Sequence, residues 1–240
     1  GVGLYRTEFL YMSTNKLPGE KELYENFKTV AQEMEKKPVV IRTLDIGMDK
    51  QLPGIRTNDE DNPALGLRGI RLSLANPELF LSQLKGILRA SFYGNIKILY
   101  PMVSSVTEII QANKLLQEAK ATLKKDQVPF DDNIEIGAMI ETPAATLCID
   151  HILEHVDFVS IGTNDLVQYT LAVDRINENV AHLYQPFHPS VIRSLKQIFV
   201  AANKVGKKVS ICGELGGDPM ATMLLLGLGK LEDLSMEPHS

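Results

Sequence analysis

Polar side chains that could do chemistry follow five short apolar segments of the sequence, each with the length and composition of a buried β-strand. These polar residues are Arg6, Arg42 with Asp45, Glu141, Asn164 with Asp165, and Cys212 with Glu214. The strands of a parallel (β/α) barrel all end on the same face, and active sites are built on that face. We therefore expect these residues to belong to one site.

Two of the carboxylates, Glu141 and Asp165, end successive strands in chain order. Two oxygen ligands with open positions beside them are typical of a Mg²⁺ site, because this cation keeps several waters and takes oxygens of the substrate. Each carboxylate also lies just before an expected helix start, where capping could account for either residue alone. The matching positions of the two residues favour metal ligation over capping.

Basic residues occur in the same segments, namely Arg6, Arg42, Lys50, Arg68 and Arg175. The arginine fork binds phosphate and carboxylate groups through paired hydrogen bonds. Clustered cations repel one another, so an anionic ligand is expected among them. The alternative is pairing with a nearby acidic residue, and it is expected for one arginine, with Glu8, Asp45 and Asp174 as the candidates. Magnesium and several arginines together indicate a compact, phosphorylated substrate.

Cys212 follows the apolar run Val209–Ile211 and is close to Glu214. A single cysteine on a strand is most often an inert core residue, but the position at a strand end makes a role as an acid or nucleophile an equal alternative. The other cysteine, Cys148, lies on an apolar helical face and is expected to be an inert core residue. Two cysteines are too few for a disulfide framework, which favours a reducing compartment.

The elements that would position these residues alternate between strands and helices. Short apolar runs predict seven buried parallel strands, over Val2–Tyr5, Val39–Leu44, Ile96–Tyr100, Ile134–Ile140, Phe158–Ile161, Val209–Cys212 and Leu234–Met236. Between them, apolar residues recur at intervals of three and four, as a helix requires, within Leu23–Met34, Ile109–Leu123 and Val191–Val205. Helix starts are predicted at Thr142-Pro143 and Asp218-Pro219, and a helix end at Gly206.

This alternation predicts an α/β fold, and we favour a (β/α)8 TIM-type barrel forming a single domain over residues 1–240. Seven strands are one fewer than such a barrel needs, and the chain begins inside a strand, so the first βα unit is expected to be missing. A doubly wound sheet is the main competitor. It would carry a G-x-G-x-x-G turn after a strand, and the sequence contains none.

The composition is that of a folded protein without membrane spans, with 44% hydrophobic and 23% charged residues and a mean hydropathy of −0.04. The longest strictly apolar run is Ile198–Ala202, whereas about 20 residues are needed to cross a bilayer. The formal net charge of −5 argues against non-specific binding of nucleic acid. We expect neither a membrane nor a nucleic-acid partner.

Six ordered motifs carry a resemblance to a known family over nearly the whole chain. They are Gly3-Leu4-Tyr5-Arg6-Thr7-Glu8-Phe9-Leu10, Arg42-Thr43-Leu44-Asp45-Ile46-Gly47, Asn62-Pro63-Ala64-Leu65-Gly66-Leu67-Arg68, Ile140-Glu141-Thr142-Pro143-Ala144, Gly162-Thr163-Asn164-Asp165-Leu166 and Cys212-Gly213-Glu214-Leu215. The chain resembles the C-terminal domain of the phosphoenolpyruvate–protein phosphotransferases, which are Enzyme I of the bacterial sugar phosphotransferase system.

The resemblance implies a barrel that binds phosphoenolpyruvate (PEP), with Mg²⁺ held by Glu141 and Asp165. It implies that Cys212 protonates the enolate to give pyruvate. The residues implied to contact the substrate are Arg6, Arg42, Lys50, Arg68, Asn164, Asp165 and Arg175. The implied partners are a phosphohistidine domain of the same protein, through it a small histidine phosphocarrier protein, and a second copy in a homodimer, all in the cytoplasm.

The sequence departs from the family pattern at two positions, where Met48 replaces a glycine and Leu67 replaces an aromatic residue. None of the five histidines has the Gly-Gly-x-x-Ser-His context of the family's phosphoacceptor, and the last helix of the barrel is also expected to be missing. The runner-up functions are the barrel of a pyruvate phosphate dikinase or PEP synthase and, in a different class, a non-catalytic PEP-sensing dimerisation module.

Overall fold

A computed structural model describes residues 1–12, 16–47 and 60–236, and within these ranges the chain forms two compact units. The first unit comprises Gly1–Met102 and Thr107–Ile136, and the second comprises Val103–Val106 and Gly137–Ser240. Lys50 and Met48 lie outside the described residues. The two units are considered in turn.

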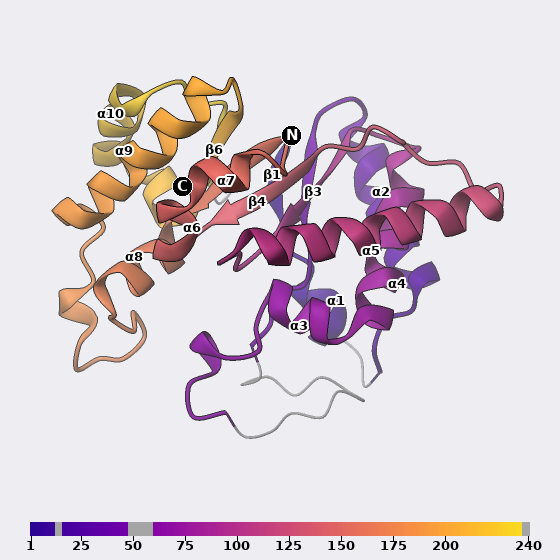
Figure 1. The fold of residues 1–240 in the computed structure, drawn as a ribbon, viewed down its shortest axis with the longest axis horizontal. Coiled ribbons are helices and arrows are strands. Elements are labelled where there is room, and N and C mark those ends of the chain that lie inside the picture. Colours follow the sequence, from indigo (N-terminus) through magenta and orange to yellow (C-terminus); the bar gives the residue numbers. More distant parts are fainter. Residues whose placement is uncertain (13–15, 48–59, 237–240) are drawn as a thin grey trace. The chain divides into compact units, whose positions relative to one another are not determined.

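The first unit contains three parallel strands in the order β1-β2-β3, with helices on the segments between and after them (Figure 1). Its elements are β1 (Val2–Tyr5), α1 (Glu8–Met12), α2 (Glu20–Met34), β2 (Val39–Arg42), the 3-10 helix η1 (Pro63–Leu65), α3 (Ile70–Ala75), α4 (Pro77–Ser91), β3 (Ile96–Tyr100) and α5 (Val106–Lys125).

Helices α2 and α4 pack against each other because the sequence places apolar residues and a glycine at their interface. Leu23 and Phe27 of α2 are fully buried. On α4, a Cβ atom at Gly86 would lie 3.1 Å from the Leu23 Cβ and 3.2 Å from the Tyr24 backbone nitrogen, so a glycine permits this close approach. An ion pair of 2.7 Å between Arg89 and Glu20 joins the same two helices.

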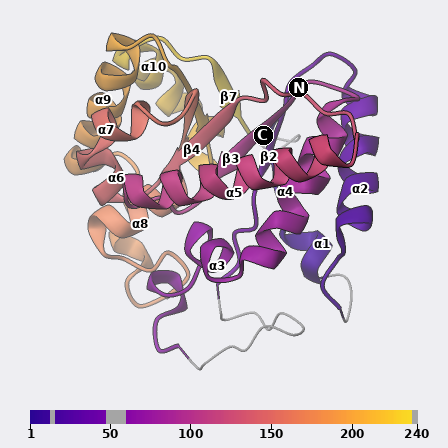
Figure 2. The same ribbon diagram turned by 45° about the vertical axis from the view of Figure 1, so that its right-hand side comes forward.

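The second unit contains four parallel strands in the order β4-β5-β6-β7. Its elements are β4 (Ile136–Ile140), α6 (Pro143–Leu147), α7 (Ile149–Leu153), β5 (Phe158–Gly162), α8 (Thr163–Leu171), the 3-10 helix η2 (Ala181–Leu183), α9 (Pro189–Lys204), β6 (Lys208–Cys212), the 3-10 helix η3 (Glu214–Gly217), α10 (Pro219–Leu228) and β7 (Asp233–Ser235). Helices α9 and α10 lie side by side in both views (Figures 1 and 2).

Helix boundaries in the second unit follow the sequence signals. Thr142 caps α6 by accepting a hydrogen bond from the Ala145 nitrogen, and Asp218 caps α10 through the Met220 nitrogen. Gly206, with φ of 69°, lies just beyond the end of α9, where a left-handed conformation closes a helix. The predicted starts and the predicted end are therefore confirmed.

The α/β fold of the barrel class is confirmed, since seven parallel strands alternate with helices along the described chain. Strand order follows chain order within each unit, whereas a doubly wound sheet reverses its order at a switch point. No described helix is long and apolar enough to span a membrane. The single domain over residues 1–240 and the missing βα unit and helix stay predictions.

Several expectations about local structure are wrong. The fourth strand begins at Ile136 rather than Ile134, and the last strand spans Asp233–Ser235 rather than Leu234–Met236. The second strand ends at Arg42 rather than Leu44, because the Leu44 nitrogen bonds to the side chain of Gln83 instead of to a neighbouring strand. Cys148 is exposed rather than in the core, because α6 ends at Leu147 and α7 begins at Ile149. Cys148 lies at the break between these two short helices, so the apolar periodicity does not continue through it.

Candidate functional site

In the first unit, Asp45 gathers two arginines beyond the end of β2. Arg68 binds its carboxylate through two hydrogen bonds, from Nε to Oδ1 at 2.9 Å and from Nη2 to Oδ2 at 3.1 Å. Arg42 contributes a contact of 2.8 Å between Nη1 and Oδ2. The Asp45 side chain is only 2% exposed, so its charge is neutralised by the two guanidinium groups rather than by water.

Arg42 is held from a second side by Glu8 of α1, whose Oε1 lies 3.0 Å from the Arg42 Nη2. The same oxygen accepts a hydrogen bond of 3.1 Å from the Asp45 nitrogen. Arg6 is exposed and forms no ion pair with any residue in the described ranges, although its charge acts on Asp45. Among the described residues, the guanidinium groups of Arg6, Arg42 and Arg68 thus outnumber the carboxylates of Glu8 and Asp45.

Burial and the nearby arginines have opposite effects on the pKa of Asp45. Burial acts to raise the pKa, but the positive charges of Arg42 and Arg68 and the hydrogen bonding from Arg68 outweigh it, with a smaller contribution from Arg6. The net result is a pKa below the usual aspartate value. Asp45 is thus a carboxylate at neutral pH, fixing the two arginines in place.

A tight backbone turn positions Arg68. Gly69 adopts φ of 60°, and a Cβ atom there would lie 2.7 Å from the Cβ of Met102 and 3.3 Å from Oδ1 of Asp45. Only glycine combines this left-handed conformation with so little space. The backbone nitrogen of Leu67, which precedes Arg68, donates to the carboxylate of Glu60.

In the second unit, Glu141 follows β4 and is completely buried. Its carboxylate lies against Gly162 at the end of β5, where a Cβ atom would overlap Glu141 Oε2 and come 2.8 Å from Cε of Met139. The glycine therefore makes room for the carboxylate. Helix α6 is capped by Thr142 and not by Glu141, so capping does not account for this buried charge.

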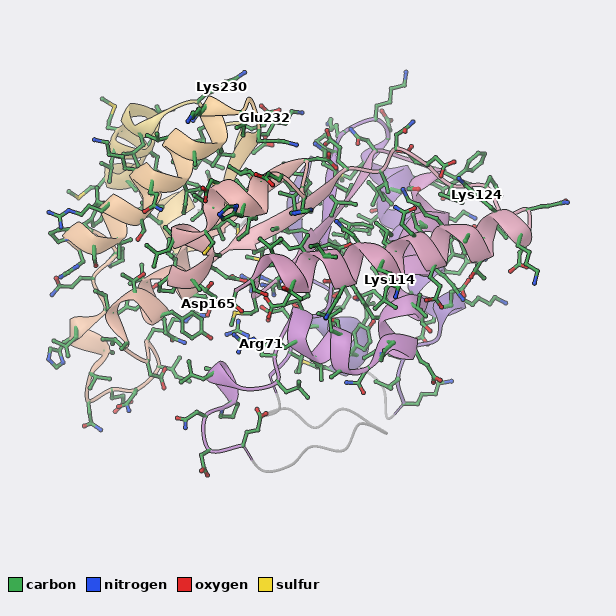
Figure 3. All side chains as sticks on the ribbon, viewed as in Figure 1. Arg71, Lys114, Lys124, Asp165, Lys230 and Glu232 are labelled. Atoms are coloured by element: carbon green, nitrogen blue, oxygen red, sulfur yellow. The ribbon has the colours of Figure 1, made fainter. Side chains whose placement is uncertain are left out.

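Asp165 lies in the first turn of α8, where a negative charge also interacts favourably with the helix dipole (Figure 3). Its place is therefore consistent with both predicted roles. Glu141 and Asp165 together supply carboxylate oxygens, and no group of three or more metal-binding side chains occurs in the described residues. Mg²⁺ characteristically uses one or two carboxylates and completes its shell with water and substrate oxygens, so the donor set fits this cation.

Asn164 and Arg175 share a single partner, Glu214. The Glu214 Oε1 lies 3.3 Å from the Asn164 Nδ2 and 3.2 Å from the Arg175 Nη1, and the Glu214 nitrogen donates to the Asn164 Oδ1 at 3.0 Å. The hydroxyl of Tyr184 donates to the Asn164 carbonyl at 3.2 Å. Partial burial, followed by the charge of Glu214, raises the pKa of Tyr184 to about 12, so it remains a donor at neutral pH. Gly213 adopts φ of 100° and leaves space for the Asn164 side chain.

An acidic partner is expected from the sequence for only one of the predicted arginines, Arg6, Arg42, Arg68 and Arg175. This expectation is wrong, because all of them except Arg6 form an ion pair within the described residues. Two of the three candidate partners, Glu8 and Asp45, do pair with arginines. Asp45 lies three residues from Arg42 in the sequence, whereas Glu8 comes from α1, 34 residues away, and Arg68 reaches Asp45 from 23 residues away. The partner of Arg175 is Glu214 rather than the neighbouring Asp174. This last ion pair is exposed, with relative side-chain exposures of 41% and 76%, so an incoming anion can compete for Arg175.

Cys212 ends β6 and is 2% exposed. Its Sγ lies 3.5 Å from the Ser160 Oγ, which donates to it, and 3.5 Å from the Ile161 carbonyl oxygen. These contacts fix the thiol within the strand ends of the second unit. The burial is compatible with a core role and with a proton donor kept away from bulk water, so both sequence interpretations remain.

The identity of the chain is decided by comparison with known families. The sequence profile described as "PEP-utilising enzyme, PEP-binding domain" matches residues 1–240. The chain belongs to this family. The predicted resemblance is confirmed by phosphoenolpyruvate-protein phosphotransferases, of which that of Priestia megaterium is 51% identical over 240 residues and that of Listeria monocytogenes serovar 1/2a is 52% identical over 239. The corresponding protein of Bacillus subtilis (strain 168) is 50% identical over 239 residues.

This PEP-binding domain spans 42% of the length of these three relatives, which in turn cover 100% of the chain. Among solved structures, a HpcH/Hpal aldolase/citrate lyase family protein from Burkholderia cenocepacia J2315 matches with a TM-score of 0.54. The match covers 91% of this chain and 74% of the chain of that protein. The sequence identity is 14%, so the likeness concerns the fold alone. The roles of the individual site residues stay predictions.

Proposed function

We propose that this PEP-binding domain supplies the PEP-binding half of a phosphotransferase that moves the phosphoryl group from PEP to a protein histidine and releases pyruvate. The observation that carries the proposal is the cluster of Arg6, Arg42 and Arg68 around Asp45, in a chain that matches a PEP-binding domain throughout. The names of the relatives favour this phosphotransferase over a dikinase or synthase.

The arginines bind the two anionic groups of PEP, its phosphate and its carboxylate. Their forks are already oriented by Asp45 and Glu8, so little side-chain order must be gained when the anion arrives. Arg175 and Asn164 release the exposed carboxylate of Glu214 when PEP binds and contact PEP in its place. Positive charge held at fixed positions stabilises the charge that develops as the phosphoryl group leaves.

In the transfer step, a bond forms between the phosphorus and a histidine nitrogen of another domain, and the bond from phosphorus to the enol oxygen breaks. The electron pair of that bond stays on enolpyruvate. Cys212 then gives its thiol proton to the methylene carbon, which completes pyruvate and leaves a thiolate. Mg²⁺, held by Glu141 and Asp165, would neutralise charge on the phosphate and enolate oxygens when bound.

The proposal includes the partners that this chemistry needs. They are the histidine-bearing domain of the same full-length protein, a small histidine phosphocarrier protein that receives the group from it, and a second copy of the chain in a homodimer. They rest on the similarity to the phosphotransferases, of whose length the chain covers 42%. A cytoplasmic location is proposed with them.

A transfer assay tests the proposal. The chain is mixed with PEP, Mg²⁺ and the remaining, histidine-bearing part of the Bacillus subtilis relative, and phosphohistidine and pyruvate are measured. Both products should form in equal amounts, and Arg68→Gln should abolish them. The matched control is Arg89→Gln, which breaks the ion pair with Glu20 outside the cluster and should leave transfer unchanged. PEP binding without either product would instead support a sensing module.

A further inference from the structure

Gln83 is a buried polar side chain on α4 that has no part in the chemistry described above. It is 1% exposed, and both ends of its amide form hydrogen bonds. Its Oε1 accepts from the Leu44 nitrogen at 3.0 Å, beyond the end of β2. Its Nε2 donates to the Thr7 Oγ1 at 3.2 Å, beyond the end of β1. One side chain therefore joins the segments that follow two neighbouring strands.

The hydrogen bonds continue from Thr7 to the backbone of Arg42. Thr7 is fully buried, and its hydroxyl donates to the Arg42 carbonyl oxygen at 3.0 Å. The hydroxyl has one proton, so its oxygen must take the bond from Gln83 as an acceptor while its proton goes to Arg42. This fixes every donor and acceptor in the chain from Leu44 through Gln83 and Thr7 to Arg42.

The residues joined in this way are the immediate neighbours of the cluster. Arg6 directly precedes Thr7, and Asp45 directly follows Leu44. Arg42 itself accepts the last bond through its carbonyl oxygen. Beyond the paired strands, the Gln83 amide and the Thr7 hydroxyl thus link the backbone next to Arg6 to the backbone of Arg42 and Leu44.

We infer that Gln83 is a positioning residue for anion binding by Arg6 and Arg42, acting through Thr7 and Leu44. The inference rests on the proposed function, because it assigns PEP to this cluster. An amide is needed at this position: a carboxylate cannot donate to Thr7, and an apolar side chain of equal length leaves the buried Leu44 nitrogen without a partner. In either case the side chain at position 83 no longer links Thr7 to Leu44.

The first test compares Gln83→Met with Ser91→Ala in the same chain. Ser91 is the last residue of α4, whereas Gln83 lies near its middle; Ser91 is 5% exposed and also makes two hydrogen bonds, donating to the Leu88 carbonyl oxygen and accepting from the Asp131 nitrogen. Both variants should melt at a lower temperature than the wild type. The dissociation constant for PEP with Mg²⁺, measured by calorimetry, should rise at least about tenfold in Gln83→Met, the factor equivalent to roughly one hydrogen bond. It should change less than about twofold in Ser91→Ala.

Thr7 provides a second pair of variants, which decides the matter if Gln83→Met does not fold. Thr7→Val removes the hydroxyl and should weaken PEP binding, whereas Thr7→Ser keeps it and should restore affinity. Equal affinity in Thr7→Val and Thr7→Ser, or in Gln83→Met and the wild type, overturns the inference and leaves the proposed function standing. Equal weakening in Ser91→Ala also overturns it, because stability alone would then explain the loss. Absence of PEP binding by the wild type overturns the proposed function and this inference with it.

Discussion

Replacing Asp45 by asparagine removes the charge that holds the basic cluster together while it keeps the size and one acceptor oxygen of the side chain. Arg68 would lose one of its two hydrogen bonds to this side chain, and Arg42 would lose its charged contact with it while keeping that with Glu8 at 3.0 Å. The excess positive charge of the cluster, counted over Arg6, Arg42 and Arg68 against Glu8 and Asp45, would increase by one. The fold should therefore become less stable and the site more attractive to anions.

The size of the stability loss follows from the burial of the carboxylate. Breaking a buried ion pair by removing one partner typically costs about 3–5 kcal/mol. The lower end applies here, because Glu8 still neutralises Arg42 and the Arg68 side chain is 17% exposed to water. For a chain of this size each kcal/mol lowers the melting temperature by about 2–4 °C, so Asp45→Asn should melt roughly 6–12 °C below the wild type.

The assay is thermal unfolding followed by circular dichroism between pH 3 and pH 8, with and without phosphate. The folded pKa of Asp45 is lower than its unfolded value, so its stabilisation is complete above about pH 4 and is lost as the pH falls through the folded pKa. The gap between wild type and Asp45→Asn should thus be constant from pH 5 to pH 8 and narrow below pH 4. Phosphate should raise the melting temperature of the variant more than that of the wild type.

The matched control for this experiment is Asp132→Asn. Asp132 pairs with Lys124 at 2.8 Å, but both side chains are more than half exposed, at 54% and 58%. Such a surface pair contributes about 1 kcal/mol or less, so the control should melt within about 3 °C of the wild type. Asp45 does not stabilise the fold through its buried charge if Asp45→Asn melts like the control at pH 7, or if the difference in melting temperature from the wild type stays constant down to pH 3.

Three further predictions concern the second unit. Gly162→Ala should displace the Glu141 carboxylate and weaken Mg²⁺-dependent PEP binding measured by calorimetry, whereas Gly227→Ala, where a Cβ atom meets nothing within 4 Å, should leave it intact; equal affinities would count against the assignment. Thr142→Ala should lose the cap of α6 and about 1–2 kcal/mol in urea unfolding, and an unchanged midpoint would contradict this. Cys212→Ala should keep PEP affinity but form pyruvate about 10²–10⁴-fold more slowly in the transfer assay, with single-turnover phosphorylation less affected; equal losses in both steps would exclude it as the proton donor.

Features with a local signature could be predicted from the sequence. Thr142-Pro143 and Asp218-Pro219 mark helix starts because cap and proline act within one turn, and the structure confirms both. The strands Val2–Tyr5 and Ile96–Tyr100 are found with the predicted bounds, since a short apolar run between two turns is too short for a buried helix and forms a buried strand instead. The partners of Arg42 could be anticipated because they lie nearby in the sequence or at the end of the adjoining strand.

Features that depend on distant residues could not be predicted in this way. Gln83 is 76 residues from Thr7, and nothing in its own helix distinguishes it from a surface glutamine. The ion pair between Arg175 and Glu214 spans 39 residues, and Asp174 is the closer acidic residue in sequence. The apolar neighbours of Cys148 predict a core position, which is wrong, because no proline or glycine in the sequence marks the break between α6 and α7.

The most direct test of the central claim is calorimetric titration of the chain with PEP, in the presence and absence of Mg²⁺. We expect saturable binding of one PEP per chain that requires Mg²⁺. In Glu141→Gln, the fold should be retained, but the Mg²⁺ requirement and most of the affinity for PEP should be lost. Heat that does not saturate at any PEP concentration with Mg²⁺ present would contradict the claim, as would equal affinity for PEP with and without Mg²⁺ in the wild type.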